Sequence, residues 1–188
     1  MNEFNTNKQN NFPLKLVTDD WLDGFCKTGT GQLKTLTNSM SPLIQAGDTV
    51  YIKKITDPSK IYIGDIIAFW RGNMLITHRV IRKIKKNNTV CFLERGDRTQ
   101  HTNPVNAEFV MGIVKKIQKK DSVLDLETNK MKFYNRTLGF VFLSEWGVRL
   151  YGSKITGPLA LIKPAAKVFY TFLKSLLHRL MSRSVKNK

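Results

Sequence analysis

The stretch TNSMSPLIQAGDTVYIKK (residues 37–54) has a turn-rich first half and a strand-like second half. Ser39 lies three residues before a proline, and Gly47-Asp48 is a typical turn pair. Apolar and polar residues then alternate, as they do in a strand with one buried face. The stretch therefore predicts a strand entered through a loop that carries Ser39. This serine is either a turn residue or a nucleophile held on a rigid frame.

The strand pattern continues on both sides of this stretch. About seven short segments between residues 31 and 128 alternate in hydropathy or form brief apolar runs, and residues 85–88 have the composition of a hairpin turn. No helical pattern lies between these segments, so crossover connections for a parallel sheet are not expected. Residues 31–128 are therefore predicted to form a mostly β, antiparallel domain, and the whole chain an α+β protein.

The two ends of the chain differ from this β domain in composition. Residues 1–30 are predicted to form a polar lead with a short helix near its end. Residues 129–188 are predicted to be a helical, basic extension, in which residues 164–183 form an amphipathic helix opened by Pro164. From Lys163 onward the chain holds seven Lys or Arg residues and no Asp or Glu.

Composition restricts the chemistry further. The formal net charge of +17 indicates an anionic partner such as a lipid surface, an acidic peptide or nucleic acid. Cys26 and Cys91 lie far apart, which is typical of free thiols, and the three histidines lack the spacing of metal ligands. We expect no metal and no cofactor. Neither a signal peptide nor a membrane-spanning helix is predicted, so a cytoplasmic or peripheral membrane location is expected.

Ser39 and His78 have structural explanations when each is considered alone. A serine near a proline is common in turns, and His78 lies within an apolar strand where a hydrogen-bonded histidine is ordinary. Together they suggest nucleophilic catalysis, because a serine hydroxyl becomes a good nucleophile only when a neighbouring base removes its proton.

The surrounding motifs resemble the four motif blocks of the type I signal peptidase superfamily. Residues 37–54 contain a Ser-Met-x-Pro nucleophile block, and 61–70 a Gly-Asp-apolar block. Residues 75–84 contain a base-Arg-Val block, and 92–100 a late Gly-Asp block. The resemblance covers roughly residues 34–117 in the order of the family. It implies an antiparallel signal-peptidase-like β domain and a serine endopeptidase that cleaves a leader or signal peptide.

One position selects a branch of this superfamily. Bacterial signal peptidases and the related self-cleaving repressors use a lysine base, whereas the endoplasmic-reticulum and archaeal type has His-Arg, as His78-Arg79 does here. The resemblance thus implies that Ser39 is the nucleophile and His78 the general base. A histidine needs little adjustment of its pKa to accept a proton at neutral pH. The backbone N–H of Ser39 and the hydroxyl of Thr37 are the implied oxyanion donors.

The third catalytic residue is where the sequence departs from the family. Histidine-type enzymes have aspartates several residues after the late Gly-Asp pair, and Asn103 is closest to that place here. Asn103 could orient an imidazole but could not offset its charge. Asp97, within the Gly-Asp pair, is therefore the favoured third residue, and Asn103 is the alternative.

Substrate contacts are also implied by the resemblance. Signal peptidases hold their substrates as an extended strand, and residues 33–37 form the natural edge for such pairing. We assign substrate binding to Leu33, Thr35, Met40 and Ile67, and expect cleavage after small residues.

Two other functions remain open at this point. A regulatory relative would resemble the self-cleaving repressors, but only about 30 residues precede the first strand and the base is not lysine. A non-catalytic module would bind peptide, nucleic acid or lipid. For the basic residues 164–183, an anionic membrane surface is favoured over nucleic acid because the helix is also strongly apolar. Packing of this helix on the β domain is the structural alternative. A monomer is expected.

Overall fold

A computed structural model describes residues 17–86, 89–152, 168–177 and 179. The chain forms these elements in order: α1 (Asp19–Thr28), β1 (Thr30–Lys34), β2 (Thr49–Lys54), η1 (Pro58–Lys60), β3 (Ile66–Arg71), β4 (Met74–Lys86), β5 (Thr89–Arg95), β6 (Asn103–Asn106), η2 (Ala107–Phe109), β7 (Val110–Gln118), β8 (Val123–Asp125) and α2 (Asn129–Gly152). Residues 168–177 are also helical.

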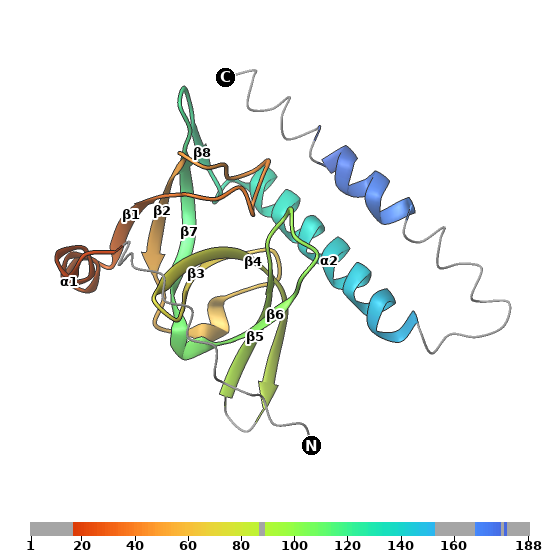
Figure 1. Cartoon of the computed structure of the whole chain (residues 1–188), viewed down its shortest axis with the longest axis horizontal. Helices are drawn as coiled ribbons and strands as arrows, with labels where there is room; N and C mark the ends of the chain where they lie inside the picture. The colour runs from red at the N-terminus through yellow and green to blue at the C-terminus, as the bar shows by residue number, and fades with distance from the viewer. Residues whose placement is uncertain (1–16, 87–88, 153–167, 178, 180–188) are drawn as a thin grey trace, which may run out of the picture.

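The strands form one curled sheet with the order β1-β2-β7-β3-β4-β5-β6, and β8 pairs with β7 beside this path. Every strand pair is antiparallel. The sheet bends round on itself like half a barrel, and the helices that follow it lie on one side (Figure 1). The predicted class, a mostly β antiparallel domain followed by helices, is confirmed.

Local sequence explains why α1 is short. The side chain of Thr18 caps its first turn by accepting a hydrogen bond from the backbone N–H of Trp21. The helix ends at Gly29, which has a φ of 69° and so takes the left-handed conformation that glycine tolerates best. The helix lies within the predicted lead at residues 1–30, of which residues 1–16 fall outside the described residues.

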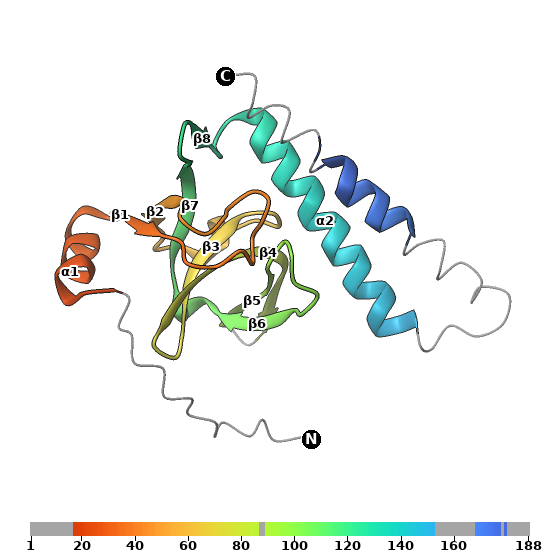
Figure 2. The same cartoon turned by 45° about the horizontal axis from the view of Figure 1, so that its top comes forward.

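The hydrophobic core has two parts, one on each face of the sheet. The smaller part fills the inside of the curl and contains Ile61, Ile67, Phe69, Val80, Phe92, Val105, Val110 and Ile113. The larger part lies between the opposite face and the helices, and includes Met40, Ile81, Leu93, Leu138 and Phe142. Helix α2 runs along this second face (Figure 2). The two faces of β4 and β5 therefore meet different surroundings.

A β-bulge in β4 changes the register between these two faces. The pairing with β5 shifts between Val80 and Arg82, leaving Ile81 as the extra residue. Ile81 is buried in the larger core, and the guanidinium of Arg82 lies 5.5 Å from the ring centroid of Trp146 on α2. Two consecutive residues thus face α2, whereas Val80 faces the inside of the curl.

Helix α2 approaches the sheet closely at two glycines. Gly64 has a φ of 96°, and a Cβ atom built there would lie 2.4 Å from the carbonyl oxygen of Asn135. A Cβ atom on Gly139 would lie 2.7 Å from the backbone nitrogen of Gly64. Because neither glycine has a side chain, the helix can bring Asn135 within reach of the sheet.

The second predicted helix is partly within the described residues. Leu177 is buried in the larger core, and Tyr170 and Leu173 pack against it. The inner face of segment 168–177 therefore does pack on the domain. Among the described residues, no helix has the length and apolar character needed to cross a bilayer.

Candidate active site

Ser39 and His78 are brought together although 39 residues separate them in the chain. The Ser39 Oγ lies 3.1 Å from His78 Nε2, which is a hydrogen-bonding distance. Ser39 lies in the turn before β2, and its carbonyl oxygen accepts a hydrogen bond from the Arg98 N–H at 2.9 Å. The sequence prediction that these two side chains form a pair agrees with this geometry.

His78 is fixed by its place on β4. It lies opposite Ile67 on β3 and faces the inside of the curl, where the Phe69 ring packs edge-on with its centroid 6.3 Å from that of the imidazole. The histidine side chain is only 13% exposed. Its second ring nitrogen, Nδ1, makes a short hydrogen bond with the carboxylate of Glu94 on β5.

Glu94 was missed by the sequence reasoning. It lies opposite Val80, two residues from His78 along β4, so the two side chains are diagonal neighbours on one face of the sheet. Its carboxylate is fully buried. A serine hydroxyl, an imidazole and a buried carboxylate linked in this order also occur in serine hydrolases, where they activate the hydroxyl group.

Two further side chains hold the other oxygen of Glu94. Arg71 Nη2 donates to Oε1 at 2.6 Å, and Asn103 Nδ2 donates to the same oxygen at 3.2 Å. Burial alone would raise the pKa of this carboxyl group. The hydrogen bonds from His78 and Arg71 and the positive charge of Arg71 outweigh that effect and leave the pKa below its ordinary value. Glu94 is therefore held as a carboxylate.

Asp97, the favoured third residue, has a different partner. Its two oxygens accept hydrogen bonds from Arg79 Nε and Nη2 at 2.8 and 2.7 Å, and both side chains are completely buried. Arg79 Nη1 also donates to the carbonyl oxygen of Gly64 and to Asn135 Oδ1. The expected contact between Asp97 and His78 is therefore corrected, because Arg79 holds Asp97 on the α2 side of the sheet. Asn103 reaches the site by contacting Glu94, not through His78.

The implied oxyanion donors lie beside the Ser39 hydroxyl group. Thr37 is exposed, and its Oγ1 lies 3.4 Å from Ser39 Oγ. The intervening residue, Asn38, accepts a hydrogen bond from the Ala46 N–H at 3.0 Å. This contact fixes the shape of the loop, so the Thr37 hydroxyl stays near the serine.

The residues assigned to substrate binding fall into two groups. Met40 and Ile67 are 2% and 0% exposed, and they belong to the two parts of the core rather than to an open surface. Leu33 lies on β1, an edge strand that pairs with β2 on one side. Thr35 follows β1, and its hydroxyl donates to the Asp48 carbonyl oxygen at 2.9 Å. Only the second group borders an edge that could receive a peptide.

Gly96 leaves room for the pair to meet. A Cβ atom at this position would lie 2.8 Å from the carbonyl oxygen of Ser39 and 3.1 Å from His78 Nε2. Any other residue would press on both the Ser39 carbonyl oxygen and the His78 imidazole. Within the described ranges, no cluster of three or more His, Cys, Asp or Glu residues could hold a metal ion.

Comparison with known proteins gives one partial similarity. No family model matches the sequence. The chain is 32% identical over 78 residues to signal peptidase I W of Bacillus subtilis (strain 168). The matched region covers 40% of this chain and about two-fifths (41%) of that protein. The chain is therefore distantly and partially similar to the type I signal peptidase superfamily.

Proposed function

We propose that this chain is a serine endopeptidase of the signal peptidase type, which cleaves a leader or signal peptide after small residues. The observation that carries the proposal is the continuous hydrogen-bond path from Ser39 through His78 to Glu94. The partial similarity to a signal peptidase supports the same reaction class. A signal peptidase with a histidine in place of lysine needs a group that orients the ring, and Glu94 meets that need.

In the first step, Ser39 Oγ attacks the carbonyl carbon of the scissile peptide bond and passes its proton to His78 Nε2. His78 Nδ1–H donates to Glu94, whose negative charge stabilises the imidazolium that forms. The backbone N–H of Ser39 and the Thr37 hydroxyl donate to the developing oxyanion, an effect worth about 3 kcal/mol for one donor.

In the second half of the reaction, the imidazolium gives its proton to the leaving amine nitrogen as the C–N bond breaks. An acyl ester on Ser39 remains. Water then attacks this ester, with His78 accepting the water proton and returning it to Ser39 Oγ. Atoms and charge balance over the cycle, and no cofactor takes part.

Substrate binding follows from the edge of the sheet. β1 is the terminal strand, and residues 33–37 lead directly from it to Ser39. An extended peptide pairing there would present its carbonyl groups beside the nucleophile, because strand pairing fixes the register of the backbone. Leu33 and Thr35 would contact such a peptide, while Met40 and Ile67 would support the site from the core.

The test is cleavage of peptides that carry an Ala-x-Ala site by the purified chain. Ser39→Ala and His78→Ala should each lower kcat by about a thousandfold or more, because the pair acts as a unit. Ser41→Ala in the same turn and His101→Ala in the exposed β5–β6 loop are matched controls that should keep their activity. Near-normal cleavage by His78→Ala would overturn the mechanism. Folded wild-type protein without Ser39-dependent cleavage would favour a non-catalytic peptide-binding module.

A further inference from the structure

The helical part of the molecule carries most of the exposed large apolar side chains of the described residues. Of the twelve large hydrophobic residues exposed in the described part of the chain, seven lie on α2 and segment 168–177. We call this set the outer helical surface, and its members are Phe133, Phe140, Leu150, Val168, Phe169, Phe172 and Leu176. Four of the seven, Phe133, Val168, Phe169 and Phe172, are at least 58% exposed. Three of these four lie within five residues of one another, so chance scatter of single apolar residues does not explain them.

On α2 the exposed aromatics lie opposite the buried face. Phe133 and Phe140 are seven residues apart, which is about two helical turns, so they share a face. They are 72% and 55% exposed, whereas Leu138 and Phe142 on the other side are fully buried. Nothing in the sheet therefore covers this side of the helix.

Segment 168–177 has the same division between an inner and an outer face. Its inner face is occupied, because Leu177 is buried in the core and Lys174 Nζ lies 5.0 Å from the centroid of the Phe142 ring. Phe169 and Phe172 on its outer face are 58% and 64% exposed. The segment runs alongside α2 in both views (Figures 1 and 2). Packing on the domain therefore leaves the outer face open.

The charges on these two helical segments have one predominant sign. The described parts of α2 and of residues 168–179 contain six basic residues and one acidic residue, Glu145. Glu145 is bound by Arg95 at 2.7 Å and also by Arg149, so its charge is offset. The basic residues are Lys130, Lys132, Arg136, Arg149, Lys174 and Arg179. Lys174 faces inward and Arg149 binds Glu145, so the proposal does not depend on these two.

We propose that the outer helical surface lies against an anionic lipid surface. Exposed aromatic and aliphatic side chains on a helix enter the boundary between headgroups and acyl chains, and flanking Lys and Arg side chains meet lipid phosphates. The proposal extends the proposed function by placing the endopeptidase at a membrane surface. It depends on the surface residues and not on catalysis.

Two other occupants fit the same surface less well. A second copy of the chain would bring two basic surfaces together, and the full chain has a net charge of +17. Nucleic acid attracts the charge, but phosphate contacts give no reason for an exposed apolar face spread over two helices. An anionic lipid surface is the partner that interacts favourably with both the basic and the apolar side chains.

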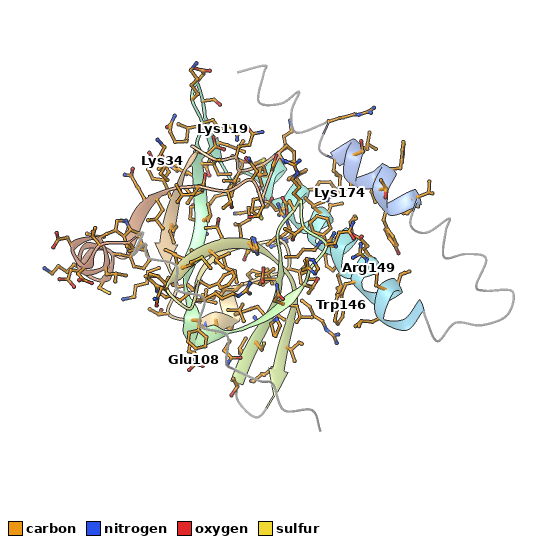
Figure 3. The ribbon with its side chains drawn as sticks, in the orientation of Figure 1. Lys34, Glu108, Lys119, Trp146, Arg149 and Lys174 are labelled. Atoms are coloured by element: carbon orange, nitrogen blue, oxygen red, sulfur yellow. The ribbon has the colours of Figure 1, made fainter. Side chains whose placement is uncertain are left out.

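The experiment is sedimentation of the full-length chain with vesicles of phosphatidylglycerol and phosphatidylcholine, compared with phosphatidylcholine alone. Phe169→Ser/Phe172→Ser should weaken binding to the anionic vesicles by about tenfold or more, since each buried phenylalanine contributes strongly to transfer from water. Phe109→Ser is the matched control, because Phe109 is 48% exposed. It lies next to Glu108, on the far side of the sheet from Lys174 and Arg149 (Figure 3).

A second measurement tests the proposal even if the double variant does not fold. In Phe172→Trp the new indole should be quenched by brominated lipids, whereas in Phe109→Trp the new indole should not be. Equal vesicle binding by the wild type and by the folded double variant would overturn the proposal, as would the absence of quenching in Phe172→Trp. Self-association that disappears in the double variant, without vesicle binding by the wild type, would assign the surface to a second copy. Vesicle binding is also measured with Ser39→Ala, which lacks the proposed nucleophile. A failure of the membrane proposal is therefore distinguishable from a failure of the proposed peptidase function.

Discussion

His78 and Arg79 are consecutive on β4, and their side chains leave opposite faces of the sheet. His78 points into the curl toward Ser39 and Glu94, while Arg79 points toward α2 and binds Asp97. Alternation along a strand requires this separation. The two carboxylates near the late Gly-Asp pair consequently have different environments, and substitutions at Glu94 and Asp97 should have different effects.

Glu94→Gln should lower the rate of peptide cleavage by about a hundredfold or more while the protein stays folded. The variant keeps the shape of the side chain but removes the charge that stabilises the imidazolium. Cleavage kinetics and circular dichroism of the same preparation measure both properties. A variant with the wild-type rate would show that Glu94 does not act on His78.

Asp97→Asn should act mainly on stability. The change leaves the Arg79 guanidinium fully buried without its counter-charge, and loss of one partner of such a pair costs about 3–5 kcal/mol of the free energy of unfolding. Urea denaturation is the measurement. If Asp97→Asn were as stable as the wild type yet inactive, the catalytic role first assigned to Asp97 would be restored.

The contribution of Glu94 to stability should depend on pH. The folded protein holds the pKa of this acid below its ordinary value of 4.5, so the folded state binds fewer protons than the unfolded state around that pH. The stabilisation is therefore complete above the unfolded pKa and is lost as pH falls through the folded pKa. The difference in free energy of unfolding between wild type and Glu94→Gln should shrink below about pH 4.5. A difference that stayed constant between neutral and acidic pH would contradict the assignment.

Thr37→Val should reduce kcat by between about tenfold and a thousandfold, whereas Thr37→Ser should retain most of the activity. Valine has the shape of threonine without the hydroxyl group proposed to bind the oxyanion, and serine keeps that group. The loss should appear in kcat and not in KM, because the bond forms only as the oxyanion develops. Equal kinetics for the valine and serine variants would assign the oxyanion to the Ser39 N–H alone.

Lys174→Met should reduce activity severalfold although residue 174 contacts no reacting atom. Lys174 Nζ donates to the Asp97 carbonyl oxygen, and the following residue, Arg98, donates its N–H to the carbonyl oxygen of Ser39. Methionine has a similar length but has neither the positive charge that lies over the Phe142 ring nor an N–H group to hold the loop. Comparison with Lys174→Arg separates the two effects, because arginine restores a donor. A Lys174→Met variant with unchanged kcat would show that the loop is held without this lysine.

Much of the fold could be predicted because its signals are local. Alternation around Val50 and Ile52 fixed the buried face of β2, and both residues are buried as the pattern indicates. The pairing of Ser39 with His78 was predicted from the order of the motifs. One extra residue within a strand does not change that order. Packing of segment 168–177 on the domain was left open, since an amphipathic pattern does not say what covers it.

Glu94 could not be predicted, and the bulge at Ile81 explains why. The hairpin begins with Lys86 opposite Thr89, and an unbroken register continued from that pair would place Asp97 opposite His78. The extra residue shifts the pairing by one, and a shift of one changes the face on which each side chain lies. The amino-acid sequence of residues 74–95 has no feature that shows where the bulge residue lies.

The same bulge has an evolutionary consequence. Deletion of the extra residue in β4 would restore the unbroken register and bring Asp97 opposite His78, while the histidine and the serine stay where they are. The acid is therefore the member of the three whose position in the chain a lineage can change in a single event. Relatives with this sheet should retain the serine and histidine at matching positions. Where β4 lacks the extra residue, the carboxylate that faces the histidine should come from the loop after β5 instead of from the end of β5.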